Sequence, residues 1–307
     1  MKTWQANIAL LIVTMIWGLG FVATDEALKF LPPMQMQIFR FGIAAIIMMI
    51  VFYKKLIKAS KKAIIYGLVI GTIFFIGMTL QTFGLKDSTV PKNAFLTVTN
   101  VVFVPLIAFV LYKRIPKNYL WYGIFVMLIG FFFLLFQFDI FNISNSIQDL
   151  KSQSHITFGD FLSLLCGFAF AFHFIAAEKF VKDEDPIVIV MFQLIVSTIL
   201  SIILAFFIEG NPANLEVNNF VLALPSLLYM AIFSSIISFI LQLVAQKYVP
   251  ASNTAVICTL ESMFAAIFAV ILGRTALSSS LIIGGLLITI GIIWAETGFN
   301  FKDEIHE

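Results

Sequence analysis

The chain has 307 residues, of which 61% are hydrophobic and 12% are charged, and its formal net charge is +2. A soluble domain carries about 25% charged and about 45–50% apolar residues, so this composition excludes a soluble globular fold and indicates a polytopic helical membrane protein. The two cysteines, Cys166 and Cys258, lie in apolar runs and form neither a disulfide framework nor a metal-ligand spacing. The small net charge gives no indication of nucleic-acid binding.

Ten apolar segments follow one another along the chain, each near the length of about 20 residues that a membrane-spanning helix needs. The first leads directly into the next hydrophobic run, so it is interpreted as a span and not as a cleaved signal peptide. The sequence therefore predicts an all-α integral membrane protein with ten transmembrane helices. The expected spans are residues 5–24, 34–53, 63–84, 94–112, 119–137, 159–180, 187–208, 221–245, 251–273 and 280–297.

The first two spans form a predicted hairpin around Pro32–Pro33. Proline lacks an amide proton and disfavours a helical conformation at the residue before it, so the pair separates two helices. Arg40 lies inside the second span. A charge within a lipid-length helix is costly, so this arginine is a candidate functional residue.

The distribution of lysine and arginine predicts the orientation. With a cytoplasmic N-terminus, thirteen of these residues fall in inside segments and five in outside segments; Arg40 completes the total of 19. Both termini are then cytoplasmic, and the polar connections 138–158 and 209–220 face outward. The five lysines between residues 54 and 62 are interpreted as topology determinants in contact with the anionic leaflet.

Weak internal repeats divide the chain into two halves. Ala27–Phe30 recurs as Ala177–Phe180 at an offset of 150, and the stretch that begins at Gln81 recurs at Gln242 at an offset of about 160. Five spans per half is an odd number, so the second half enters the membrane from the opposite side. The expected units are a first repeat (1–137), an outward-facing linker (138–158), a second repeat (159–299) and a cytoplasmic tail (300–307).

Small residues spaced four apart predict close helix contacts, because lipid gives helices no hydrophobic reason to associate. The alternative is that such spacings arise by chance in helices rich in glycine and alanine. The candidate positions are Gly67 and Gly71, Gly167 and Ala171, Ser234 and Ser238, and Ala265, Ala269 and Gly273.

Several short motifs resemble the drug/metabolite transporter superfamily, EamA type, over essentially the whole chain. They are Ile16-Trp17-Gly18 with Phe21, Pro32-Pro33, Phe39-Arg40-Phe41, Val104-Pro105 through Tyr112-Lys113-Arg114, and Leu260-Glu261-Ser262-Met263-Phe264-Ala265-Ala266 through Leu272-Gly273. The resemblance implies a ten-helix inverted-repeat carrier of small metabolites that works by alternating access, often an exporter of amino acids. The family usually has a proline and a glutamate where this chain has Ser262 and Arg274.

Arg40 and Glu261 are the strongest site candidates. Arg40 is interpreted either as an arginine that anchors a helix end by snorkelling or as a clamp for a carboxylate or a gate ion pair, for which guanidinium is suited. Glu261 lies near the middle of the expected span 251–273. A carboxyl held away from water tends to keep its proton. Glu261 could therefore couple proton movement to transport, bind a substrate ammonium, or only hydrogen-bond to a neighbouring helix.

The other candidates are polar or aromatic residues inside spans, each with a purely structural alternative. His173 titrates near neutrality but also suits a hydrogen-bonded core position, and Trp17 suits either packing or a cavity wall. Asp25 and Glu26 suit solvated helix-end charges or an outer gate. Four residues suit either interhelical hydrogen bonds or substrate binding: Gln81, Asn100, Tyr229 and Gln242.

These observations predict a secondary transporter of a small metabolite in the cell membrane, with export of an amino acid or a related compound. Its alternatives are a passive channel or facilitator and, from another class, an intramembrane enzyme. The sequence has no phosphate-binding loop, HExxH or GxSxG motif. The expected partners are the lipid bilayer and a small-molecule substrate, with no nucleic acid, and the carrier is a monomer or a homodimer. No cofactor is expected beyond proton coupling.

Overall fold

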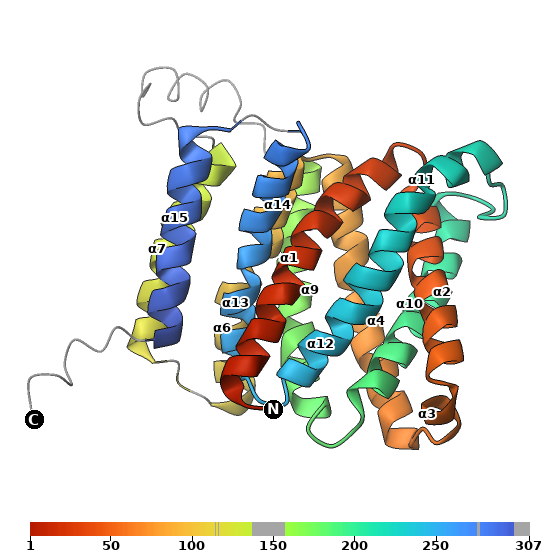
Figure 1. Ribbon diagram of the computed structural model, residues 1–307, viewed down its shortest axis with the longest axis horizontal. Coiled ribbons are helices and arrows are strands. Elements are labelled where there is room, and N and C mark those ends of the chain that lie inside the picture. Colours follow the sequence, from red (N-terminus) through yellow and green to blue (C-terminus); the bar gives the residue numbers. More distant parts are fainter. Residues whose placement is uncertain (114, 116, 137–156, 275–276, 298–307) are drawn as a thin grey trace, which may run out of the picture.

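The computed structural model describes residues 1–113, 115, 117–136, 157–274 and 277–297, and every regular element among them is a helix (Figure 1). Residues 138–156 of the expected linker, the tail and Arg114 lie outside the described residues. The first half holds α1 (Thr3–Leu28), α2 (Pro33–Val51), α3 (Tyr53–Ile57), α4 (Lys61–Lys86), α5 (Val90–Thr97), α6 (Asn100–Tyr112) and α7 (Asn118–Phe136). The second holds α9 (Phe158–Phe180), α10 (Pro186–Ile208), α11 (Val217–Tyr229), the π-helix η2 (Met230–Ile237), α12 (Ser238–Ala245), α13 (Ala251–Cys258), α14 (Leu260–Ile271) and α15 (Ser279–Thr297).

Within these residues, eight helical segments are long and apolar enough to cross a membrane, and α7 and α15 add shorter apolar stretches. Large apolar side chains are exposed along the outer faces of the helices, as on Ile8, Leu11 and Ile12 of α1. The protein is therefore a multi-pass membrane protein whose outer faces contact lipid.

Helix ends follow local sequence signals. Pro33 and Pro186 occupy the first positions of α2 and α10, where a missing amide costs nothing. Thr157 caps α9 and forms a reciprocal capping box with Asp160. The predicted Pro-Pro hairpin between the first two spans is thus confirmed.

Three expected spans are interrupted, which the sequence analysis did not predict. Span 94–112 divides into α5 and α6 at Val98–Thr99, and span 251–273 divides into α13 and α14 at Thr259. Span 221–245 contains the π-helix η2, whose hydrogen bonds run five residues apart instead of four. Glu261 therefore lies in the first turn of α14 and not in the middle of a continuous helix.

The predicted close contacts at small residues are mostly confirmed. A Cβ on Gly67 would lie 2.5 Å from Phe192 Cβ of α10, and one on Gly167 would lie 2.8 Å from the Thr97 carbonyl oxygen. Ala265 and Ala269 are fully buried. Gly273 is the exception: α14 ends at Ile271, and Gly273 forms a left-handed turn (φ +67°) with no atom within 4 Å of its Cβ position. It terminates the helix and does not pack against a neighbour.

Two antiparallel helix pairs occupy opposite ends of the molecule, α7 with α15 and α2 with α10 (Figure 1). In the first pair Gly123 faces the carbonyl of Gly291, and Gly130 faces the carbonyl of Gly284. Gly123 and Gly284 are 161 positions apart, as are Gly130 and Gly291. Gly123 is thus equivalent to Gly284, and Gly130 to Gly291. Exchanging the two helices turns the Gly123–Gly291 contact into the Gly130–Gly284 contact.

Candidate substrate pocket

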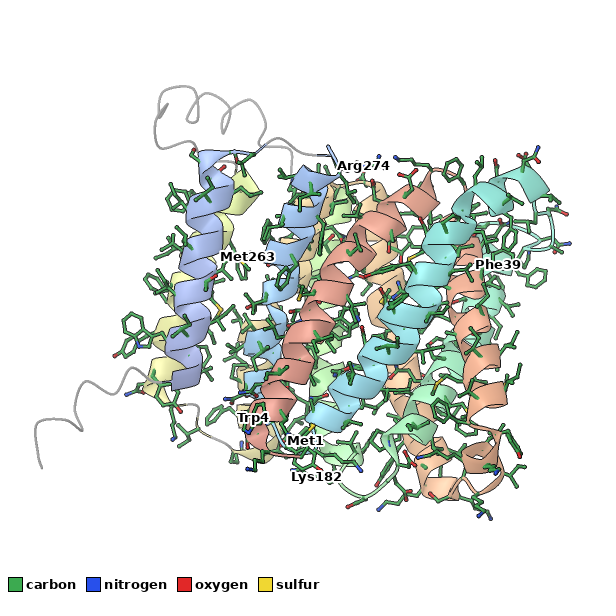
Figure 2. All side chains as sticks on the ribbon, viewed as in Figure 1. Met1, Trp4, Phe39, Lys182, Met263 and Arg274 are labelled. Atoms are coloured by element: carbon green, nitrogen blue, oxygen red, sulfur yellow. The ribbon has the colours of Figure 1, made fainter. Side chains whose placement is uncertain are left out.

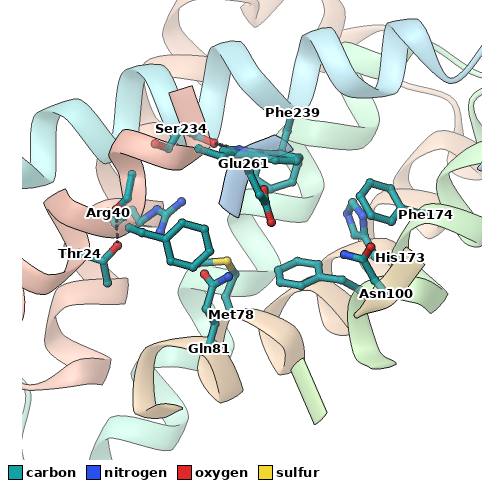
Figure 3. A pocket seen from close by; sticks show the side chains of 14 residues that line it. Thr24, Arg40, Met78, Gln81, Asn100, His173, Phe174, Ser234, Phe239 and Glu261 are labelled. Atoms are coloured by element: carbon teal, nitrogen blue, oxygen red, sulfur yellow. Dashed lines mark hydrogen bonds between the residues drawn. The ribbon is translucent and has the colours of Figure 1, made fainter. Parts of the chain in front are cut away.

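A pocket with about 530 Å³ of empty space, part of it open to solvent, lies among the interrupted helices, α1, α2, α4 and α9 (Figure 3). The lining residues are Trp17, Gly20, Phe21, Thr24, Arg40, Met78, Gln81, Asn100, Phe170, His173, Phe174, Ser234, Phe239 and Glu261. Six of the eight predicted site residues are among them.

The two halves contribute equivalent positions to this pocket. The starts of α2 and α10 are 153 positions apart, and the starts of α5 and α13 are 161 apart. Lining residues fall into pairs at the same two spacings: Trp17 and Phe170, Gly20 and His173, Phe21 and Phe174 at 153, and Met78 and Phe239, Asn100 and Glu261 at 161. The pocket thus lies where the two halves meet.

Arg40 points into the pocket from α2 and is 5% exposed. Its Nε donates a hydrogen bond to Ser235 Oγ at 3.0 Å, and its guanidinium carbon lies 5.3 Å from the centre of the Phe41 ring. Within the described residues its side chain forms no ion pair with a carboxylate. The Ser235 hydrogen bond fixes the guanidinium and leaves its two terminal amino groups for a ligand.

Glu261 is 6% exposed and lies in the pocket wall between Arg40 and Asn100 in the view of Figure 3. No described side chain hydrogen-bonds to its carboxyl or forms an ion pair with it. Gly18 of α1 brings α14 close, because a Cβ there would lie 2.9 Å from the Ala265 backbone nitrogen. The α1–α14 contact thereby holds Glu261 at the pocket.

His173 is buried, and its Nε2 lies 3.1 Å from Gln193 Oε1 on α10. The ring packs among aromatic side chains, with centroid distances of 5.8 Å to Phe239 and 5.9 Å to Phe74. The Gln193 amide nitrogen has no hydrogen-bond partner. His173 is therefore packed in the core on most sides, and its remaining face lines the pocket.

Trp17 and the π-helix form one wall. Trp17 Nε1 donates a hydrogen bond to the Ser234 carbonyl at 3.1 Å, and its ring lies 5.1 Å from that of Phe239. The Ser234 hydroxyl lines the pocket without a hydrogen-bond partner, while Ser235 holds Arg40. The wide turn of η2 thus presents two consecutive serines toward α1 and α2.

Two predicted site residues lie outside the pocket lining. Tyr229 donates a hydrogen bond from its hydroxyl to the Ile16 carbonyl at 2.8 Å, and Gln242 donates to Gln246 Oε1 at 2.6 Å. The Tyr229 bond joins α11 to α1, which is the interhelical alternative expected from the sequence. The Gln242 bond instead stays within one helix and its C-cap, because Gln246 directly follows α12. Sequence reasoning missed Ser234, Phe239 and Gln193; the spacing of 153 would have found Gln193, because it is the equivalent of Arg40.

The ends of the pocket helices carry charges that are paired. Glu26 at the end of α1 pairs with Lys29, 2.8 Å away, and with Arg274 after α14. Lys92 pairs with Asp160 at the start of α9. The described helix-end pairs therefore contrast with the unpaired charges of Arg40 and Glu261 in the pocket.

The sequence matches the model of the EamA-like transporter family twice, over residues 4–136 and 157–297. The chain belongs to the EamA-like transporter family. It is 28% identical to an uncharacterized transporter of Archaeoglobus fulgidus, covering 95% of this chain and 86% of that one. It is 25% identical to the uncharacterized transporter YyaM of Bacillus subtilis, covering 96% and 94%.

A solved crystal structure with 14% sequence identity superposes with a TM-score of 0.73 over 100% of both chains, so the two share a fold. The two family matches and the transporter relatives confirm the resemblance to the drug/metabolite transporter superfamily, EamA type. Membership assigns the chain to transmembrane transport, and the pocket between its halves is the candidate substrate site.

Proposed function

We propose that this chain is a secondary transporter that exports a small zwitterionic metabolite, an amino acid or a related compound, by alternating access. The observation that carries the proposal is the pair Arg40 and Glu261, two buried residues of opposite charge type that face one pocket from different halves. A charge left unpaired away from water costs several kcal/mol. A ligand with a carboxylate and an ammonium group would pair with both side chains at once.

Arg40 is the group that binds the carboxylate. Its guanidinium is held from one side by Ser235, and its planar donors match a carboxylate in two parallel hydrogen bonds. Glu261 binds the ammonium when substrate is present and takes up a proton when the pocket is empty. Exchange of the proton for the substrate ammonium would couple transport to a pH gradient.

Ten transmembrane helices in two inverted repeats are the architecture proposed for this cycle. The antiparallel contacts between Gly123 and Gly291 and between Gly130 and Gly284 support it, because a two-fold axis that exchanges antiparallel helices is perpendicular to them. Such an axis lies in the membrane plane. Rocking of one half against the other would open the pocket to each side in turn.

The proposed location is the cell membrane with both termini in the cytoplasm, as the lysine and arginine distribution predicts. A cysteine at Asn214, in the loop before α11, should then react with an impermeant thiol reagent added to intact cells. A cysteine at Lys58 should react only in inverted vesicles. Labelling of Lys58→Cys alone in intact cells would reverse the orientation.

Transport itself is tested with purified protein in liposomes and a panel of labelled amino acids, with and without a pH gradient. We expect accumulation against the concentration gradient only when the pH gradient is present. Entry that stops at equal concentrations would instead identify a passive facilitator. Absence of amino-acid flux in every condition would contradict the proposal.

Two substitutions assign the roles of the charges. Glu261→Gln keeps shape and hydrogen-bonding capacity but releases no proton, so it should abolish pH-driven accumulation while exchange of substrate continues in part. Arg40→Gln should abolish both. Glu184→Gln, on the surface and hydrogen-bonded to Ser60, is the matched control and should behave like the parent. Parental accumulation by Glu261→Gln would make Glu261 a structural residue.

A further inference from the structure

Asn100 and Glu261 occupy equivalent positions in the two halves. They are 161 positions apart, the spacing that also relates Met78 to Phe239 and Gly123 to Gly284. Each lies in the first turn of the helix after an interruption, Asn100 at the start of α6 and Glu261 near the start of α14. Both face the pocket. One half thus places a carboxyl, and the other an uncharged amide, at the same position.

The side chain of Asn100 also has a buried hydrogen-bond acceptor that the described residues leave without a partner. It is 3% exposed, and its side-chain oxygen forms no hydrogen bond although it is buried. A buried amide oxygen without a hydrogen-bond partner is destabilising, so such groups are rare unless they serve a ligand or a water molecule. The unpaired oxygen is a second observation, independent of the spacing.

Figure 3 shows Asn100 with His173 on the side of the pocket away from Arg40. His173 is hydrogen-bonded to Gln193, which is the equivalent of Arg40 at a spacing of 153. The charged positions of one side, Arg40 and Glu261, therefore correspond to Gln193 and Asn100 on the other. Gln193 does not line the pocket and reaches it only through His173, so the pocket wall away from Arg40 carries Asn100 and His173.

From this arrangement we infer that Asn100 forms a second, uncharged subsite that takes the far end of the substrate, where it selects a neutral hydrogen-bonding group such as an amide or a hydroxyl. Since Asn100 stands where the other half has a carboxyl, its neutrality is what excludes substrates with a second positive charge. The inference rests on the proposed function, because it assumes that Arg40 and Glu261 bind the zwitterionic end.

Asn100→Asp tests the inference by giving the subsite a negative charge. Uptake of labelled glutamine and of labelled lysine is measured in proteoliposomes that contain the purified protein. The parent should prefer glutamine, and Asn100→Asp should raise the ratio of lysine to glutamine uptake by about tenfold or more, since a buried pair of opposite charges is strongly favoured over an unpaired cation. Asn218→Asp, which adds the same charge at an exposed position of α11, should leave the ratio unchanged.

If Asn100→Asp does not fold, a second variant and a second measurement still test the inference. Asn100→Leu should lower glutamine uptake severalfold relative to alanine uptake, because alanine does not reach the subsite. Trp17 lines the pocket, so quenching of tryptophan fluorescence on titration with each amino acid gives the same comparison without transport.

The outcomes separate this inference from the proposed function. If the parent transports no amino acid, the proposed function fails. If the parent transports amino acids but Asn100→Asp and Asn100→Leu keep the parental ratios in uptake and in fluorescence, the second subsite does not exist. A higher lysine-to-glutamine ratio in Asn100→Asp, together with unchanged ratios in Asn218→Asp, supports it.

Discussion

The antiparallel pairs α2–α10 and α7–α15 stand at opposite ends of the molecule and are held by different forces (Figure 1). The α2–α10 pair is joined at both ends by polar groups. Glu209 accepts hydrogen bonds from the backbone nitrogens of Met34 at 2.8 Å and Gln35 at 3.1 Å, and Asp185 pairs with Lys55. The α7–α15 pair is joined through its glycines.

The difference reflects where water is available. Charged side chains can cross-link two helices at the ends of a pair, because the desolvation cost is small near the membrane surface. In the lipid interior close backbone approach needs small residues instead. Figure 2 shows the same contrast, with nitrogen and oxygen atoms gathered near the ends of the helices and carbon along their outer faces.

The largest expected effect comes from filling the glycine contact of α7–α15. A Cβ on Gly130 would lie 2.7 Å from the Gly284 carbonyl oxygen and 2.9 Å from Ile288 Cγ1. Gly130→Leu should therefore destabilise the protein by about 1–3 kcal/mol or more, measured as a lower unfolding temperature in detergent. Gly285→Ala is the control, because its Cβ meets only Met263 at 3.7 Å. Equal unfolding temperatures for both variants would contradict the contact.

Removing the cap of α2 should have the next largest effect. Glu209→Ala leaves two backbone nitrogens at the start of α2 without an acceptor and should cost about 0.5–2 kcal/mol. Glu216→Ala, an exposed residue bonded to Asn219, is the comparison and should cost less. An unfolding temperature of Glu209→Ala at or above that of Glu216→Ala would show that the cap does not hold this end.

At the other end of the α2–α10 pair, substitutions of Asp185 separate the contribution of its ion pair from that of its helix cap. It pairs with Lys55 and also accepts a hydrogen bond from the Ile187 backbone nitrogen at 2.9 Å. Asp185→Asn keeps the cap and loses the ion pair, which is worth only about 0–1 kcal/mol because both side chains are more than a third exposed. Asp185→Ala loses both and should unfold at a lower temperature than Asp185→Asn. Equal unfolding temperatures of the two variants, both below that of the parent, would instead assign the stability to the ion pair.

The smallest effect is expected for Asp183, an exposed loop residue paired with Lys62 at 2.8 Å. The hydrogen bond from Lys62 lowers the pKa of Asp183 below its ordinary value of 3.8. The pair therefore stabilises the fold above about pH 4, and this contribution is lost as the pH falls through the lowered pKa. Asp183→Asn should fall slightly below the parent in unfolding temperature at pH 7, and this difference should shrink as the pH falls below about 4. A difference in unfolding temperature that grows on acidification would contradict a stabilising Asp183–Lys62 pair.

The helices and the charged pocket residues could be predicted from the sequence, because each has a strong physical cause. Each expected span is mostly helical in the described residues, because the backbone of an apolar run near lipid length has to satisfy its own hydrogen bonds. Arg40 and Glu261 reach one pocket for the same reason, since a charge within such a helix has to face protein or water.

The interruptions could not be predicted, because neither Val98–Thr99 nor Thr259 is glycine or proline and nothing local marks a break. The first interruption lies against α9 of the other half, because a Cβ on Gly167 would lie 2.8 Å from the Thr97 carbonyl oxygen. The correspondence of Asn100 with Glu261 was within reach of the sequence, because Gln81 and Gln242 are already 161 positions apart. The starts of α5 and α13 have the same spacing and so fix an offset that was only approximate from the sequence alone. Gly273 was misassigned because a small residue after an alanine stripe continues the helical spacing and is also the residue that ends helices.

The π-helix distinguishes the second half from the first, in which α4 holds the equivalent position as a continuous α-helix. A π turn contains more residues than an α turn, and loss of that surplus rotates everything on one side of it relative to the other. Ser234, which accepts the Trp17 hydrogen bond, and Ser235, which holds Arg40, both belong to this segment. A change of winding there would move both contacts in one step, so the shape of this helix and the occupancy of the pocket are mechanically linked.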